Sequence, residues 1–174
     1  MTNSSPNALS FSHRILAILS RLNLVAGAFI LLLLIAGFIA RNWVFTALGV
    51  RPPEGNESLI LGMRAIMVAG LAAVAMVHWI LSRLLAMVHT VRIGDPFVAE
   101  NAERLKEIAW AVLGLEVLHA GIAAIAGSVS TPAIPLDIRW SFNLTRWLTV
   151  LLLFVLARVF EQGTVMREDL EGTV

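Results

Sequence analysis

Three ionisable side chains within apolar stretches have the greatest capacity for chemistry in this sequence. Glu116 and His119 are three positions apart, so on a helix they share one face. His78 lies in the preceding apolar stretch, which is expected to pack beside theirs. An ionisable group inside a membrane costs roughly 2.5–3.5 kcal/mol on insertion scales, so each is a candidate functional group.

Three interpretations of this polar cluster (His78, Glu116 and His119) stay open. A metal site needs three or four ligands, and the Glu-x-x-His pattern occurs once, whereas di-iron bundles repeat it and add further glutamates. A proton-responsive pair is chemically reasonable, because histidine titrates near neutral pH. We favour a polar clamp between two helices, in which each hydrogen bond contributes about 0.6 kcal/mol. We therefore expect no bound metal and no other cofactor.

Common enzyme signatures are missing from the sequence. It contains no His-Glu-x-x-His, no Gly-x-Ser-x-Gly and no glycine-rich phosphate loop before a helix. Asp95 and Asp137 lie outside the apolar stretches, which argues against intramembrane proteolysis by paired aspartates. The chain has no cysteine, so thiol catalysis and thiolate metal sites are excluded. We expect a protein that is not an enzyme and has no catalytic residues.

The composition indicates that these residues lie in a membrane protein. Hydrophobic residues make up 58% of the chain and charged residues only 14%, whereas soluble domains carry about 25% charged residues. So few charges could not cover the apolar surface in water, but a surface that faces lipid needs none. The net charge of +1 gives no footprint for nucleic acid. The predicted partner is the lipid bilayer.

Four stretches are long and apolar enough to cross that bilayer. A hydrocarbon core of about 30 Å needs about 20 residues of helix. The stretches lie at about 22–40, 59–85, 108–129 and 144–160. We expect an all-α fold, a four-helix transmembrane bundle, as one domain over 1–174 with a mobile polar leader at 1–12.

The second and third stretches are joined by a helical hairpin that should project beyond the bilayer. The helical pattern of the second stretch continues to residue 93, and 58–93 would be about 54 Å long as a helix. Gly94-Asp95-Pro96 then breaks the chain, with residue types that suit a helix C′ position, an N-cap and a first helical turn. We expect the third helix to start beside Pro96 and to run through the charged segment 100–107 before it enters the membrane.

The distribution of basic residues predicts the orientation. With the N-terminus inside, eight basic residues lie on the inner side: Arg14, Arg21, Arg83, Arg92, Arg104, Lys106, Arg158 and Arg167. Five lie on the outer side: Arg41, Arg51, Arg64, Arg139 and Arg146. Because cytoplasmic loops carry the excess of basic residues, both termini and the hairpin are predicted to be cytoplasmic.

The hairpin and the tail carry a family resemblance. Gly94-Asp95-Pro96-Phe97, followed by Glu100-Asn101 and Arg104-Leu105, resembles the G-x-P-F…E-N…R-L signature of a bacterial membrane family, domain of unknown function 2975. The tail resembles its usual ending, with Phe160, Gly163, Glu168-Asp169-Leu170 and Val174. The resemblance implies a small four-span protein of the bacterial inner membrane. It supplies no catalytic residues, and members often lie beside a gene for a helix-turn-helix regulator.

These observations lead to competing functional hypotheses. The first is a non-enzymatic membrane protein whose hairpin and tail bind and regulate a cytoplasmic protein, with a helix-turn-helix transcription factor as the partner the resemblance implies. In the signature, Phe97 is expected to fold back against the hairpin and Asn101 to bond the backbone near the turn, with a docking role second. The alternative is a small transporter or channel subunit with a polar path, which would require a homo-oligomer. A purely structural membrane protein is the third.

Overall fold

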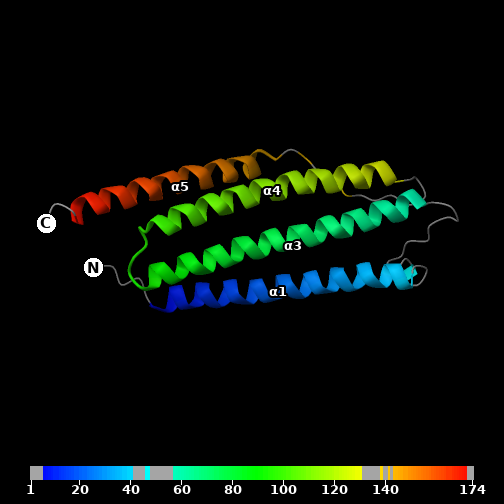
Figure 1. Ribbon diagram of the computed structural model, residues 1–174, viewed down its shortest axis with the longest axis horizontal. Helices are drawn as coiled ribbons and strands as arrows, with labels where there is room; N and C mark the ends of the chain where they lie inside the picture. Colours follow the sequence, from blue (N-terminus) through cyan, green and yellow to red (C-terminus); the bar gives the residue numbers. More distant parts are fainter. Residues whose placement is uncertain are drawn as a thin grey trace. The chain divides into compact units, whose positions relative to one another are not determined.

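The chain forms four long helices that account for most of its described residues. The computed structural model describes residues 6–40, 46–47, 57–130, 138, 141 and 143–171. The helices, labelled in Figure 1, are α1 (Pro6–Ile39), α3 (Glu57–Arg92), α4 (Ala99–Val129) and α5 (Leu144–Glu171). Each is long and apolar enough to cross a membrane. The prediction of an all-α protein with four apolar helices is confirmed, and these helices indicate a multi-pass membrane protein.

The helices extend further than the predicted spans at both ends of the chain. Helix α1 begins at Pro6, a residue whose fixed φ suits a first helical position, so residues 6–12 of the expected leader are helical. The first five residues of that leader lie outside the described part of the chain. Helix α5 continues to Glu171, eleven residues beyond the expected span end at 160. The polar tail is therefore an extension of a helix.

The described residues group into two compact units. Unit 1 comprises 1–22, 76–114 and 143–174, and unit 2 comprises 23–75 and 115–142. Three helices contribute a segment to each unit, whereas α5 belongs to unit 1 alone. The prediction of a single domain over 1–174 stays a prediction. The turn between α3 and α4, which carries the central signature, lies in unit 1.

In unit 2, glycines bring helices into close contact. A Cβ added at Gly27 of α1 would lie 2.7 Å from the Val74 Cγ1 of α3, so only a glycine fits there. Beside it, the Asn23 side chain donates a hydrogen bond to the Val74 carbonyl over 2.9 Å. A Cβ at Gly62 of α3 would lie 2.6 Å from the Val129 Cγ1 of α4. Small residues that allow backbones to approach are typical of helix packing in lipid.

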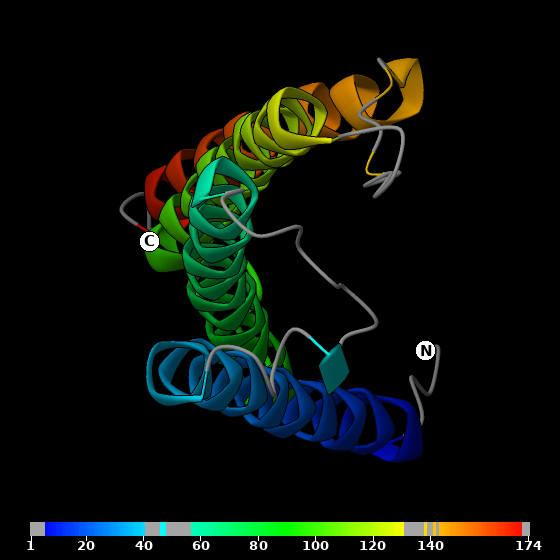
Figure 2. The ribbon, with the colours of Figure 1, turned by 90° about the vertical axis from the view of Figure 1, so that its right-hand side faces the viewer.

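In unit 1, the first half of α4 packs between α3 and α5. Figures 1 and 2 both show α4 beside each of these helices. On α4, Leu105, Ile108 and Ala109 are buried and form the core of the unit. Trp110 of α4 meets the Phe154 ring of α5 edge-on, with ring centroids 5.3 Å apart. The helices of unit 1 are therefore held by a small apolar core along one face of α4.

Candidate functional site: the hairpin and the tail

Helix α3 ends in a hydrogen-bonded cap built around Gly94. The Asp95 N–H donates to the Thr90 carbonyl over 3.1 Å, and the Gly94 N–H donates to the Val91 carbonyl over 3.2 Å. This pair of bonds is the Schellman motif, which places a residue with positive φ at C′. Gly94 has a φ of 89°, a conformation that glycine adopts at little cost. The sequence prediction of a C′ glycine is confirmed.

The start of α4 differs from the prediction. The helix begins at Ala99, and the Asn101 N–H donates to the Val98 carbonyl over 2.9 Å, so Val98 stands at the N-cap. The expectation of a helix start beside Pro96, with Asp95 as the N-cap, is wrong. The Asp95 carboxylate, which would have to accept from the first N–H groups of α4 as an N-cap, pairs with Arg167 of α5 instead.

Asn101 is the centre of the hairpin's polar network. Its side chain is fully buried, at 0% exposure. Its Nδ2 donates to the Thr90 Oγ1 over 2.7 Å and to the Pro96 carbonyl over 2.9 Å. Its Oδ1 accepts a hydrogen bond from the Arg104 Nη1 over 2.8 Å. One amide thus joins the end of α3, the turn and the start of α4, and the predicted bond to backbone near the turn is confirmed.

The Phe97 ring packs against α5. Its centroid lies 5.3 Å from that of Phe160 in a tilted arrangement. A Cβ added at Gly163 would lie 3.0 Å from the Phe97 Cδ1, so the ring rests directly on the bare backbone of that glycine. The sequence-based expectation placed Phe97 against the hairpin itself, whereas its ring contacts in the structure are with the tail helix. The central signature and the tail signature therefore meet in space.

Two ion pairs join the helices of unit 1. Arg167 of α5 pairs with Asp95 in the turn. Further along the hairpin, the Arg83 Nε of α3 lies 2.5 Å from the Glu107 Oε2 of α4, and the Arg83 guanidinium also stacks over the Trp79 ring at 4.5 Å. The side chains of both pairs are roughly one third to two fifths exposed, where ion pairs stabilise by about 1 kcal/mol or less. These ion pairs fix the orientation of the segments they join more than they stabilise the fold.

We call this arrangement, residues 87–105 together with 160–167, the hairpin–tail assembly. A hollow of about 290 Å³ opens beside it, lined by Asp95, Phe97, Glu100, Thr164 and Arg167 among others. Thr164 is buried and donates to the Phe160 carbonyl over 3.0 Å. The groups here are carboxylates, guanidinium groups, an amide and hydroxyls, which suit recognition of polar surfaces by hydrogen bonds and charge.

The predicted polar cluster is divided between the two units. His78 belongs to unit 1, where its Nδ1 lies 3.2 Å from the Ser20 Oγ of α1. Glu116 and His119 belong to unit 2, and His119 is exposed. The His78 side chain thus has a hydrogen-bonding partner on α1. Among the described residues, no three His, Asp or Glu side chains are grouped to hold a metal ion. The role of the cluster as a clamp stays a prediction.

One contributor to the network had no signal in the sequence. Thr90 lies in the last turn of α3, and its Oγ1 donates to the Met87 carbonyl over 2.8 Å while it accepts from Asn101. A threonine within a helical pattern commonly bonds to its own backbone in this way. Its residue type therefore does not indicate that it also accepts a hydrogen bond from another side chain. Only the fold of the turn brings it within reach of Asn101.

Comparisons with known proteins identify the family of the chain. No curated protein and no solved structure is similar to the chain at a significant level. Residues 53–174 match the family described as "Protein of unknown function (DUF2975)". The match includes α3, α4 and α5, and with them the whole hairpin–tail assembly. Because it spans well over half of the sequence, the chain belongs to this family, as its central signature predicts.

Proposed function

We propose that the chain is a non-enzymatic protein of the bacterial inner membrane that binds and regulates a cytoplasmic protein through the hairpin–tail assembly. Both termini are cytoplasmic in this proposal. The basic residues that support this orientation include Arg92, Arg104 and Arg167, which all belong to the assembly. The partner class that the family resemblance implies is a helix-turn-helix transcription factor.

The observation that carries the proposal is the union of the two signature segments. Phe97 rests on Gly163 and Phe160, Asp95 pairs with Arg167, and the buried Asn101 fixes the turn between them. Segments more than sixty positions apart in the chain thereby form one preorganised surface. A surface fixed in advance binds a partner without the entropic loss of ordering it, which favours a recognition role.

Exposed apolar side chains on this surface support a protein partner. Ile93 in the turn is 68% exposed and Met166 on α5 is 62% exposed, and Val165 beside it is also exposed. All three lie beyond the predicted spans, which end at 85 and 160 on these helices. In this proposal the acyl chains of the bilayer end before these residues, and a docked protein covers them.

Replacing Ile93 and Met166 together by aspartate is the test of this proposal. Both side chains are exposed, so the fold should be unchanged, while a docked apolar surface would meet two unpaired charges. The matched control is Ile138→Asp, an exposed isoleucine in the loop predicted to be on the opposite side of the membrane. The measurement is quantitative capture of cytoplasmic proteins by the three full-length chains in mild detergent, followed by titration with the purified partner.

A DNA-binding regulator should be captured by the natural chain and by the Ile138→Asp control, and lost from the double variant. Its dissociation constant should rise at least about tenfold, the change expected when one buried contact is lost. Identical sets of captured proteins for all three chains would contradict the proposal.

A further inference from the structure

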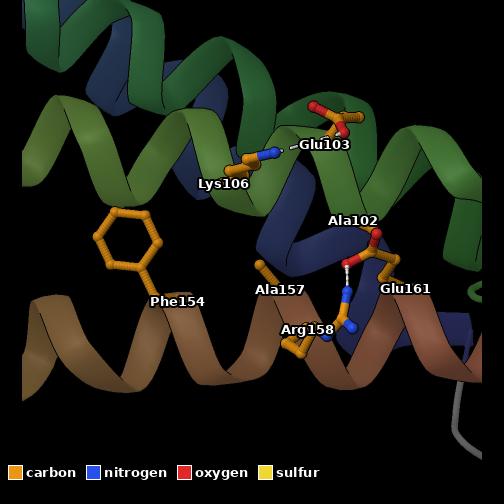
Figure 3. A pocket seen from close by; sticks show the side chains of 7 residues that line it. All are labelled: Ala102, Glu103, Lys106, Phe154, Ala157, Arg158 and Glu161. Atoms are coloured by element: carbon orange, nitrogen blue, oxygen red, sulfur yellow. Dashed lines mark hydrogen bonds and ion pairs between the residues drawn. The ribbon is translucent and has the colours of Figure 1, made fainter.

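A groove between α4 and α5 is lined by charged residues from both helices. Its volume is about 150 Å³, and it lies in unit 1 (Figure 3). Glu103 and Lys106 line it from α4, Phe154, Arg158 and Glu161 line it from α5, and Ala102 and Ala157 leave it open between the helices. Each helix therefore presents one cation and one carboxylate to the same groove.

These charges are held only by weak local pairs. The Lys106 Nζ lies 4.0 Å from the Glu103 Oε1, and the Arg158 Nη1 lies 2.8 Å from the Glu161 Oε2, both at i,i+3 spacing. All four side chains are more than half exposed. Ion pairs in such positions contribute little to stability, so their members can turn toward a ligand with little loss.

The groove has a fixed order of chemistry along the membrane normal. Lys106 lies two residues before the third predicted span, and Arg158 lies two residues before the end of the fourth. Because the helices are antiparallel, Glu103 and Glu161 each lie three residues further out than the cation of their own helix, by about 4.5 Å. Phe154 lies further in, and Figure 3 shows it at the opposite end of the groove from the two glutamates. Phe154 is thus the deepest of these side chains, and on each helix the carboxylate lies further out than the cation.

A phospholipid with a primary amine in its headgroup has the matching order. Its acyl chains lie deepest, its phosphate follows, and its ammonium group is outermost. We propose that this groove binds a phosphatidylethanolamine-type lipid, with the phosphate on Lys106 and Arg158 and the ammonium on Glu103 and Glu161. The side chain of Phe154 contacts the start of the acyl chains. This proposal rests on the membrane-spanning arrangement and is independent of any cytoplasmic partner.

The glutamates decide the lipid class. A site for an anionic lipid would carry cations alone, as basic pockets for anionic headgroups do. Here two carboxylates stand where the headgroup continues beyond the phosphate. They bind an ammonium group more strongly than the neutral hydroxyls of a glycerol headgroup, because hydrogen bonds between two ionised groups are the stronger ones. The groove therefore selects a zwitterionic lipid over phosphatidylglycerol.

The test is native mass spectrometry of the full-length chain in detergent with equal amounts of phosphatidylethanolamine and phosphatidylglycerol. The natural chain should retain phosphatidylethanolamine preferentially. Lys106→Gln with Arg158→Gln should lower its retention about tenfold or more, the effect of losing charge-assisted hydrogen bonds. Glu103→Gln with Glu161→Gln should instead switch the preference to phosphatidylglycerol. A switch in preference, unlike a loss of all lipid binding, requires that the variant is folded.

The matched control removes two exposed cations from α1 of the same unit, through Arg14→Gln with Arg21→Gln. It should retain lipid like the natural chain. Equal retention of both lipids by the natural chain, or equal losses in the control and in the Lys106/Arg158 variant, would overturn the proposal. Displacement of the lipid by soluble phosphoethanolamine at the same concentration would also overturn it, because the groove would then serve a water-soluble ligand.

Discussion

Replacing Asn101 by leucine is expected to lower the free energy of unfolding by about 2–4 kcal/mol. The substitution keeps a side chain of similar size but removes one acceptor and two donated hydrogen bonds at a fully buried site. The Pro96 carbonyl and the Arg104 guanidinium lose their partner, and such groups cost more than the bond itself when water cannot replace it. The amide joins α3, the turn and α4, so its loss affects all three.

The measurement is unfolding of the purified chain in detergent micelles by increasing sodium dodecyl sulfate, followed by circular dichroism. Gln162→Leu is the control, since it replaces an exposed amide on α5 by the same apolar side chain. The control should change stability by less than about 0.5 kcal/mol. A loss for Asn101→Leu no larger than that of the control would show that the buried network does not stabilise the hairpin.

Replacing Gly163 by leucine is expected to destabilise the chain by about 1–3 kcal/mol, the usual effect of overpacking. Even a Cβ would stand 3.0 Å from the Phe97 Cδ1 and 3.3 Å from its Cε1, so a leucine must push the ring off α5. The helix propensity of leucine works in the opposite direction, by somewhat less than 1 kcal/mol. The net loss therefore reports the contact between the two signatures.

A double-mutant cycle separates that contact from other effects. In a Phe97→Ala background the space beside Gly163 is open, and Gly163→Leu should then be neutral or slightly stabilising. The coupling energy should lie within about 0.5–3 kcal/mol, as for residues in direct contact. Gly121→Leu on α4, where a Cβ meets nothing within 4 Å, is the matched control and should show no coupling to Phe97. Additive effects of Gly163→Leu and Phe97→Ala would contradict the packing.

The local features of the hairpin could be predicted from sequence because their causes are local. A glycine after a helical pattern in a Gly-Asp-Pro run predicts a C′ cap, and Gly94 has that role. Apolar stretches of the required length predict the four helices for the same reason, since span length is set by the bilayer. None of these inferences requires knowledge of the tertiary contacts.

The features that could not be predicted depend on partners far away in the chain. Asp95 is an acceptable N-cap by residue type, but Arg167 on α5 takes its carboxylate. From the sequence, Phe97 is only an apolar residue in a turn. The packing of its ring on the backbone of Gly163 depends on the fold. Helix α5 also continues beyond residue 160, where Gly163 and Arg167 contact the hairpin. The two signatures are far apart in the sequence, and only the fold shows that they are in contact.

Single-cysteine labelling in spheroplasts tests the central claim most directly, that the hairpin and the tail share the cytoplasmic side of a four-span protein. The natural chain has no cysteine, so each introduced thiol reports alone. Exposed positions are available in the turn at Ile93, on the tail at Met166, and in the loop before α5 at Ile138.

With a membrane-impermeant maleimide, Ile138→Cys should be labelled in intact spheroplasts. Ile93→Cys and Met166→Cys should be labelled only after the membrane is permeabilised. Labelling of Ile93→Cys from outside intact spheroplasts, or labelling of Ile93→Cys and Met166→Cys from opposite sides, would contradict the account.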